Sequence, residues 1–442
     1  MRELIVQGPV NPFRVTDNPC LEEREWGPIL QPYLEHALTS QGRYTAEEIS
    51  RHVDFFRDCV AGWLGPGPTY NHETGMMQTP FPGSLTNDHT PFELSLCWKS
   101  KQQKGRPVVR YVIDVIPSNL EPSRMAAFKT AIAVIESLEQ TGINTTNGLA
   151  LRTFPNIWSK VTREMIELER QAHRSTVCSR CSPSGVFVAF DLVASEAFAK
   201  FYWLFPVCLG TPDVCQGIMR TMRSCIAVER SFSTVLESWA KVQQYISRYP
   251  SVLQPRMLSI DTTRYPQWRV KVYVRCIFRD TNRYEDLEPH LTLGGAISLS
   301  ASFRETCNNL WTSLTSLGLD SIPGTGPKYC LLMYDLPAVS SQKMSAKLYV
   351  MCQEIPRVDS FVSRCLHDSC PVLRDATIVK EMSQATDPTA YICEIGLAPK
   401  SRETEVSIYS NPSYSAQSTW RNRVDEDGYL KKKRRVIAPK SE

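Results

Sequence analysis

The stretch Arg269-Val270-Lys271-Val272-Tyr273 alternates charged or aromatic residues with valine. In a β-strand, successive side chains point to opposite faces, so Arg269, Lys271 and Tyr273 share one face and the two valines share the other. A valine-rich face fits against other apolar residues. The alternation therefore predicts a strand with an apolar outer face, and an inner face that carries two cations and an aromatic ring.

The pattern of a basic residue followed two positions later by tyrosine recurs along the chain. It appears again as Lys200-Phe201-Tyr202 and Lys347-Leu348-Tyr349, and the three lysines are 71 and 76 residues apart. Arg110 lies on a further apolar run. Between these copies, pairs of segments with helical periodicity alternate with pairs of short runs rich in Val, Tyr, Phe and Ile. We therefore expect an α+β fold in which about ten strands close into a barrel with helices outside.

The bulk composition is that of an ordinary globular protein. The chain has 442 residues, is 42% hydrophobic and 22% charged, and has a formal net charge of +4. This mild charge gives no argument for nucleic acid, and charged residues interrupt each apolar run well before the ~18 residues of a membrane span. We expect one domain over residues 1–418 and a charged, disordered tail over residues 419–442, which contains five consecutive basic residues from Lys431 to Arg435.

The cysteines bear on the compartment of the protein. There are fifteen of them, an odd number, scattered through apolar patterns, and the N-terminus has no apolar signal core. They are interpreted as reduced, buried thiols, and a cytoplasmic location is expected. The lone Cys178-Ser179-Arg180-Cys181 has no second pair at zinc spacing, so a loop with two free thiols is favoured over a metal site.

The repeated basic and aromatic faces predict a particular chemistry. Several cations inside a barrel need an anionic partner, and a diphosphate would serve. The tyrosine rings can stabilise a developing carbocation by cation–π attraction. Together these groups fit ionisation of an allylic diphosphate. No Asp-Asp-x-x-Asp sequence occurs to hold Mg²⁺, so basic residues are expected to replace the metal and no cofactor is expected to be required.

Several motifs in order along residues 20–415 resemble one known family, the fungal dimethylallyltryptophan synthase family of aromatic prenyltransferases. The motifs are Thr-Pro-Phe-Glu-Leu-Ser at 90–95, the Val-Arg-Tyr run at 109–111, Asp191-Leu192 ahead of Lys-Phe-Tyr, Arg-Val-Lys-Val-Tyr at 269–273, Thr-Leu-Gly-Gly at 292–295, Trp311, Lys-Leu-Tyr at 347–349 and Ala-Tyr-Ile at 390–392. The resemblance implies a ten-stranded antiparallel barrel built from αββα repeats. It also implies a prenyl donor and an aromatic small-molecule acceptor as partners, and it leaves a homodimer open.

The resemblance assigns roles to residues that match the family's motifs. Glu93 matches the glutamate that accepts a hydrogen bond from the aromatic nucleophile. The residues that match the diphosphate-binding set are Arg110, Lys200, Arg269, Lys271 and Lys347. The residues that match the tyrosines surrounding the allyl cation are Tyr202, Tyr273, Tyr349 and Tyr409. Tyr391 matches a further tyrosine on a late strand.

Two departures from the family pattern concern the acceptor. The run 185–189 lacks the lysine that tryptophan-using members carry, and Glu405 stands where simple counting places a second shield tyrosine. Residues 87–91 and 95–99 resemble branches that act on fused polycyclic phenols. We therefore favour a hydroxylated polycyclic, polyketide-derived acceptor in fungal secondary metabolism. The alternatives are an indole or tryptophan-derived acceptor and a non-catalytic small-molecule-binding barrel, while a nucleic-acid role would depend on the C-terminal basic run alone.

Overall fold

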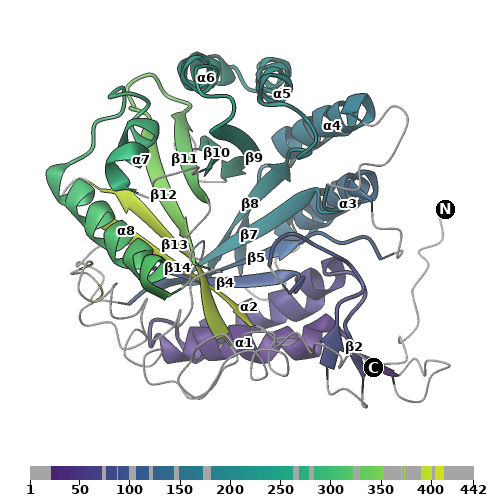
Figure 1. Cartoon of the computed structure of the whole chain (residues 1–442). Coiled ribbons are helices and arrows are strands. Elements are labelled where there is room, and N and C mark those ends of the chain that lie inside the picture. Colours follow the sequence, from purple (N-terminus) through teal and green to yellow (C-terminus); the bar gives the residue numbers. More distant parts are fainter. Residues whose placement is uncertain are drawn as a thin grey trace, which may run out of the picture.

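The structure of the protein is a computed structural model (Figure 1). The residues that it describes are 21–71, 76–86, 88–98, 106–118, 123–143, 149–172, 181–261, 268–277, 283–321, 329–352, 370, 373, 390–400 and 404–412. The expected tail at 419–442 and a helix expected over 358–366 lie outside the described residues.

Ten of the described strands close into an antiparallel barrel. The order around the barrel is β8-β7-β5-β4-β14-β13-β12-β11-β10-β9, and β9 pairs again with β8. The predicted barrel is therefore confirmed. Its strands are β4 Phe92–Trp98, β5 Val108–Asp114, β7 Val186–Val193, β8 Glu196–Leu204, β9 Leu253–Asp261, β10 Arg269–Ile277, β11 Tyr329–Pro337, β12 Ser345–Met351, β13 Ala390–Pro399 and β14 Thr404–Pro412.

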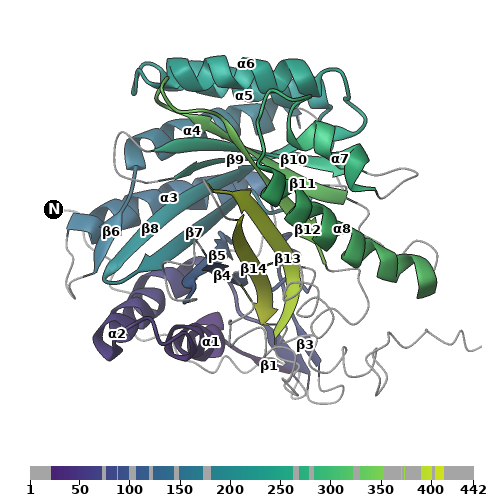
Figure 2. The ribbon, with the colours of Figure 1, turned by 90° about the vertical axis from the view of Figure 1, so that its left-hand side faces the viewer.

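Helices ring the barrel in chain order (Figure 1), and the view in Figure 2 places α1 and α2 on the opposite side from α5 and α6. The helices are α1 Trp26–Ser40, α2 Ala46–Phe55, α3 Arg124–Ile143, α4 Pro155–Ala172, α5 Thr211–Cys225, α6 Phe232–Ile246, α7 Tyr284–Leu291 and α8 Ala301–Ser321. None of the helices in the described ranges is long and apolar enough to cross a membrane.

Shorter elements complete the described chain. A π-helical turn and a 3-10 turn extend α2 over Phe56–Val60 and Ala61–Trp63. A small antiparallel sheet of β1 Leu21–Glu23, β2 Thr69–Asn71 and β3 Met76–Gln78 lies beside the barrel, and β6 Ala150–Arg152 pairs with β8 in parallel.

The apolar core lies between the helices and the outer face of the barrel. The outward valines Val270 and Val272 of β10 are buried, as the alternation predicts. Phe201 of β8 stacks on Trp158 of α4 with ring centroids 4.6 Å apart. Because this outer shell supplies the hydrophobic stabilisation, the inner face of the barrel is free to carry charges and tyrosines.

Three of the elements that the sequence patterns do not predict contain proline. Proline normally disfavours a helix interior or a central strand, yet α1 contains Pro32 and α7 contains Pro289 near its end. The missed strand β9 contains Pro255 beside a β-bulge, where the register with β10 shifts and the ladder needs no N–H from that residue. By contrast, the sequence Thr45-Ala46-Glu47-Glu48 has the pattern of a capping box, and Thr45 and Glu48 form that box at the start of α2.

Candidate active site

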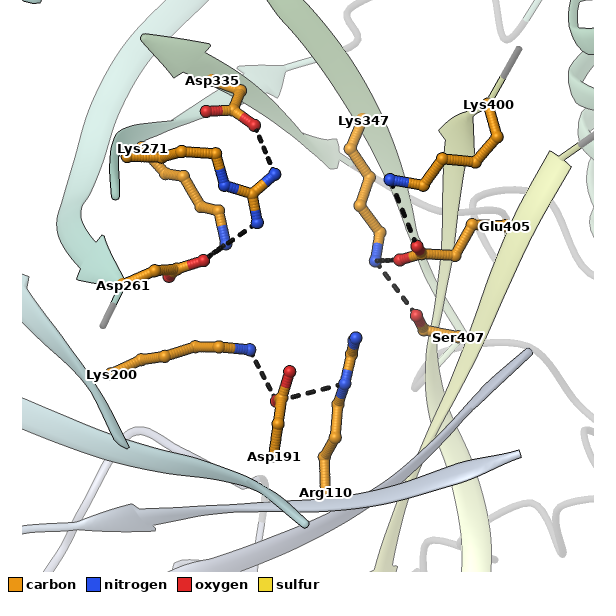
Figure 3. Close-up of polar contacts among 11 residues, drawn as sticks. Arg110, Asp191, Lys200, Asp261, Lys271, Asp335, Lys347, Lys400, Glu405 and Ser407 are labelled. Carbon is orange, nitrogen blue, oxygen red and sulfur yellow. Dashed lines mark hydrogen bonds and ion pairs between the residues drawn. The ribbon is translucent and has the colours of Figure 1, made fainter. Parts of the chain in front are cut away.

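A ring of charged side chains surrounds one end of the barrel lumen, as the close-up in Figure 3 shows for most of its members. Strands that follow each other along the chain form antiparallel pairs, such as β7 and β8. The basic members come mainly from the second strand of each pair, and the acidic members come mainly from the first. We call this set the charged ring. Its members are Arg110, Lys200, Arg269, Lys271, Lys347, Lys400, Asp191, Asp261, Asp335 and Glu405.

The ring is held together by shared carboxylates. Asp191 Oδ1 lies 3.1 Å from Arg110 Nε and 2.5 Å from Lys200 Nζ. Asp261 Oδ2 accepts hydrogen bonds from Lys271 Nζ at 2.5 Å and from Arg269 at 3.0 Å. Asp191 therefore joins cations of two different strands, β5 and β8, whereas Asp261 joins two cations of the neighbouring strand β10 (Figure 3).

The remaining pairs close the ring on its other side. Arg269 also donates to Asp335 Oδ2 at 2.8 Å. Lys347 Nζ donates to Ser407 Oγ at 3.0 Å and lies 3.9 Å from Glu405, which also pairs with Lys400 at 3.5 Å. Lys347 passes over Gly396 of β13, where a β-carbon would come within 2.6 Å of Lys347 Cε, so a larger residue would displace the end of the lysine side chain.

Burial and mutual attraction set the protonation of these groups. Burial alone would raise the pKa of Asp261, but Lys271, Lys200 and Arg269 lower it far below its ordinary value. Burial lowers the pKa of Lys271 to about 8, although Asp261 opposes this effect. Six basic and four acidic side chains surround the cavity, so the charged ring has a formal surplus of two positive charges. An anionic ligand would neutralise that surplus.

Four tyrosines lie directly below the charged ring and form what we call the tyrosine arc. They belong to alternate strands, β8, β10, β12 and β14, and neighbouring ring centroids are 5.7–5.9 Å apart. Burial raises the pKa of each hydroxyl well above its usual range, so the rings stay neutral. The arc therefore presents four polarisable aromatic rings at one level of the lumen. Its members are Tyr202, Tyr273, Tyr349 and Tyr409.

The tyrosine arc contributes to the walls of two cavities. The first, which we call the basic cavity, has a volume of about 410 Å³ and is bounded by the charged ring. The second, which we call the glutamate cavity, has a volume of about 320 Å³ and contains Glu93 and Glu394 together with apolar side chains such as Phe187 and Leu331. Both cavities share the four tyrosines and Val112. The arc thus forms the boundary between a cavity bounded by the charged ring and a cavity that combines a few charged side chains with apolar walls.

Glu93 faces the glutamate cavity from β4 and is only 9% exposed. Burial raises its pKa to about 7, while a hydrogen bond that the Cys393 thiol donates to its Oε1 at 2.9 Å opposes the rise. A carboxyl with this pKa can exchange a proton near neutral pH. Glu93 is therefore suited to accept a hydrogen bond or a proton from a molecule in this cavity.

Three arginines lie on the wall of the glutamate cavity, and one of them, Arg124, forms an ion pair with Glu169. Arg256 and Arg275 have no carboxylate partner in the part of the chain that the structure describes. Burial, with repulsion from Arg275 and Arg124, lowers the pKa of Arg256 to about 10. The guanidinium of Arg275 lies 3.8 Å from the centroid of the Tyr329 ring. This wall therefore attracts an acidic group.

The structure brings the sequence-predicted residues together in one lumen. The five predicted basic residues lie in the charged ring, the four predicted tyrosines form the arc, and Glu93 lies in the glutamate cavity. Tyr391 is on β13, but its side chain lies outside the described residues. Counting along the sequence places Glu405 at the position of a shield tyrosine. Glu405 instead belongs to the charged ring. It precedes Tyr409 by four residues, which is two lumen-facing positions along β14.

Sequence reasoning misses the acidic half of the ring. Asp261 precedes Lys271 by ten residues and Asp191 precedes Lys200 by nine, in each case on the preceding strand of an antiparallel pair. In the barrel, Asp191 is opposite Arg110 and Asp335 is opposite Lys271. An acid near the far end of the preceding strand is therefore the signal for three basic strands, β8, β10 and β12, and the unpredicted strand β9 conceals one copy of it.

The family profile described as tryptophan dimethylallyltransferase matches residues 22–379. The chain belongs to this family. A 4-O-dimethylallyl-L-tyrosine synthase of Claviceps purpurea is 25% identical over 62% of this chain and 58% of its own length. An indole diterpene prenyltransferase of Tolypocladium album is 25% identical over 62% of this chain and 61% of its own length. The matched stretch thus spans about three fifths of these relatives.

Solved structures share the fold. The crystal structure of AnaPT from Neosartorya fischeri superposes with a TM-score of 0.63 at 14% identity, over 87% of this chain and 92% of that one. At this identity the similarity establishes the barrel architecture and not the activity. The family assignment and the fold both agree with the resemblance that the sequence motifs carry.

Proposed function

We propose that this family member is a metal-independent aromatic prenyltransferase that moves a dimethylallyl group from its diphosphate to a fused aromatic acceptor. The observation that carries the proposal is the charged ring, with its surplus of positive charge, directly above the tyrosine arc. An allylic diphosphate has two parts that match these two layers. Its diphosphate is anionic, and its prenyl group becomes cationic as the bond between them breaks.

In the proposed reaction, the diphosphate occupies the basic cavity against Arg110, Lys200, Arg269, Lys271 and Lys347. The allylic C–O bond breaks and its electron pair remains on the diphosphate, where the cations stabilise the growing negative charge. The prenyl group extends to the tyrosine arc, whose rings stabilise the allyl cation and exclude water. Basic side chains supply the charge that Mg²⁺ supplies in metal-dependent enzymes, so no step requires a metal ion. Tyr391 of β13 is proposed as a further tyrosine of the site.

The glutamate cavity is the proposed acceptor site. Glu93 would accept the hydrogen bond of an acceptor O–H or N–H and so increase electron density in the aromatic ring. The inward position at Phe187 has an aromatic ring in the run 185–189, where no lysine is available. Arg256 and Arg275, which no described carboxylate pairs, favour an acceptor that carries an acidic group. We therefore propose a hydroxylated polycyclic acceptor, whereas two relatives are named for tyrosine and for an indole diterpene.

The proposal has three further parts. Residues 1–418 form one prenyltransferase domain, followed by a charged tail over 419–442. The protein acts in the cytoplasm, in line with the free thiols of the described cysteines. Its partners are the allylic diphosphate and the aromatic acceptor, and the assembly compatible with the family is a homodimer.

The test is product formation from defined substrates. The full-length chain is incubated with dimethylallyl diphosphate and, in parallel, a dihydroxynaphthalene, an indole derivative or L-tyrosine, with and without EDTA. Mass spectrometry should detect a product heavier by one dimethylallyl group, in equal amount with EDTA. A non-catalytic barrel would bind the diphosphate and yield no prenylated product with any of these acceptors. An absolute need for added Mg²⁺ would refute the metal-independent part.

A further inference from the structure

A β-bulge on β13 controls which of its side chains enter the lumen. The register with β14 pairs Ile392 with Ser410 and then Glu394 with Tyr409, so Cys393 is an extra residue between them. Without the bulge, Ile392 and Glu394 would face the same way. With it, Ile392 packs in the hydrophobic core while Glu394 faces the glutamate cavity. Bulges commonly re-aim a side chain in this manner.

The bulge places two groups near the carboxyl of Glu93. The Cys393 thiol donates to Glu93 Oε1, and Glu394 lines the same cavity as Glu93. Glu394 is directly opposite Tyr409 on β14 and is two residues from Gly396, over which Lys347 passes. On its other side Glu394 is opposite Met351 of β12, so it lies beside the tyrosine arc on the wall of the glutamate cavity, and Lys347 acts on its charge from the basic cavity.

The titratable groups around Glu394 act on it from both cavities. From the glutamate cavity, Glu93 repels its negative charge, and from the basic cavity Lys347 attracts it. Tyr349 and Tyr409 flank it on the neighbouring strands, and the thiol of Cys393 is adjacent on its own strand. Burial, reinforced by Glu93, raises the pKa of Glu394 well above its ordinary value. Glu394 therefore keeps its proton to a higher pH than an ordinary glutamate does.

We propose that Glu394 is a proton relay that connects Glu93 in the glutamate cavity with the diphosphate held at Lys347 in the basic cavity. The proposal rests on the prenyl transfer proposed above and assigns a route for the proton that the acceptor loses. The relay would carry this proton with carboxyl groups alone, since the run 185–189 contains no lysine that could accept it.

The relay balances without any further reactant. The allylic C–O bond breaks with its electron pair on the diphosphate, and the prenyl carbon bonds to the acceptor. The acceptor O–H or ring C–H then breaks, its electron pair stays on the acceptor, and the proton passes to the Glu93 carboxylate. Glu394 gives its own proton to a diphosphate oxygen and receives the proton of Glu93. The diphosphate leaves with one added proton, and both carboxyls return to their starting state.

The first test observes the protonation of Glu394 without any substrate. Infrared spectra recorded at pH 8 should contain the C=O band of a protonated carboxyl in the wild-type protein. The band should be lost in Glu394→Gln, because Glu93 with a pKa of about 7 is mostly ionised there. Asp114 and Asp335 also have raised pKa values, but they contribute equally to both proteins and cancel in the difference spectrum. Glu196→Gln, which removes a partly exposed carboxylate, is the matched control and should give no difference band.

The second test uses turnover with dimethylallyl diphosphate and a dihydroxynaphthalene. Glu394→Gln should lower kcat by about 100-fold, within the range for a lost proton-transfer group, and leave the KM for the diphosphate nearly unchanged. Glu394→Asp should recover most of the rate, because a carboxyl is restored. Formate should partly restore the rate of Glu394→Ala, which a purely structural role would not allow.

The outcomes separate the relay from the proposed function. No prenylated product from the wild-type protein would refute the transferase itself. An active wild-type protein whose Glu394→Gln variant keeps the rate, or whose infrared difference spectrum shows no lost carboxyl band, would refute the relay and leave the transferase in place.

Discussion

The two cavities of the barrel balance their charges in different ways. In the basic cavity, carboxylates alternate with cations, and Asp191 and Asp261 each join two basic side chains. In the glutamate cavity, Glu93 and Glu394 repel each other, and Arg256 and Arg275 lack acidic partners among the described residues. In the first site, the protein's own carboxylates pair with the cations that would hold a ligand. The second leaves its polar groups for the ligand to satisfy.

This difference suggests how one fold serves several acceptors. A diphosphate is the same in each donor, so a fully paired ring can be fixed in the repeated strands. An acceptor varies, and residues that need no internal partner can change without disturbing the barrel. We therefore expect substitutions in the basic cavity to abolish the reaction, and substitutions in the glutamate cavity to change its rate or its acceptor.

The largest effect is expected from loss of a cation in the charged ring. Arg110→Gln or Lys271→Gln should lower kcat/KM for prenyl transfer by about 100- to 1000-fold, the scale of one lost group that stabilises a developing anion. Arg152→Gln, which removes a cation from an exposed ion pair on the outside of the barrel, should retain the wild-type value. Wild-type rates in both ring variants would show that the diphosphate binds elsewhere.

A smaller effect is expected where the two cavities meet, at the tyrosine arc. Tyr273→Leu should lower the rate of transfer by about 5- to 30-fold, because one desolvated cation–π contact is worth ~1–2 kcal/mol. It should also raise the fraction of donor that is hydrolysed, since water gains access to the cation. Tyr273→Phe keeps the ring and should stay close to wild type. Equal losses in the two variants would assign the role to the hydroxyl instead of the ring.

The lowered pKa of Lys271 predicts how donor affinity depends on pH. Below about pH 8 the ammonium is already charged, so Lys271 adds no pH dependence to the affinity for inorganic diphosphate. Above that value binding must return a proton to Lys271, and affinity should fall by up to about tenfold per pH unit. In Lys271→Arg the guanidinium stays charged and the extra fall should disappear. The affinity of both proteins is measured by calorimetric titration over the same pH range. Ionisation of the ligand affects both proteins equally, so the difference between their affinities reports the protonation of Lys271.

The smallest effect is expected from Gly396→Ala, which tests the packing of one cation. The new methyl group would approach Lys347 Cε to 2.6 Å and Nζ to 2.9 Å, so the lysine must move. We expect the Kd for inorganic diphosphate to rise by about threefold to tenfold, a shift of ~1 kcal/mol. Gly62→Ala is the control, because its added methyl group meets nothing within 4 Å. An unchanged Kd in Gly396→Ala would remove Lys347 from the donor site.

Much of the donor site could be predicted from the sequence, because strand alternation alone sets which residues share a face. Lys271 and Tyr273 enter the lumen for this reason, and so do the other copies of the repeat. The acidic partners are harder to predict, since Asp261 lies on a strand that Pro255 conceals. The assignment of Glu405 to the tyrosine level fails because counting residues does not fix the depth in a barrel.

The glutamate cavity could be predicted only in part. Glu93 follows from the family motif, but Glu394 enters the lumen only because of the bulge at Cys393. A bulge reverses the alternation that sequence reasoning relies on, so the pattern alone would place Glu394 on the wrong face. Arg256 is likewise the extra residue where the register between β9 and β10 shifts. The residues that depart from regular strand geometry are those that distinguish the acceptor side.

The division between the two cavities is tested most directly by the binding of inorganic diphosphate in the presence of EDTA. Isothermal titration calorimetry on the wild-type protein, Lys271→Gln and Glu93→Gln compares one residue from each side. We predict binding of one diphosphate to the wild-type protein, an affinity at least about tenfold weaker in Lys271→Gln, and an unchanged affinity in Glu93→Gln. Equal weakening in the two variants, or binding that appears only when Mg²⁺ is added, would contradict the account.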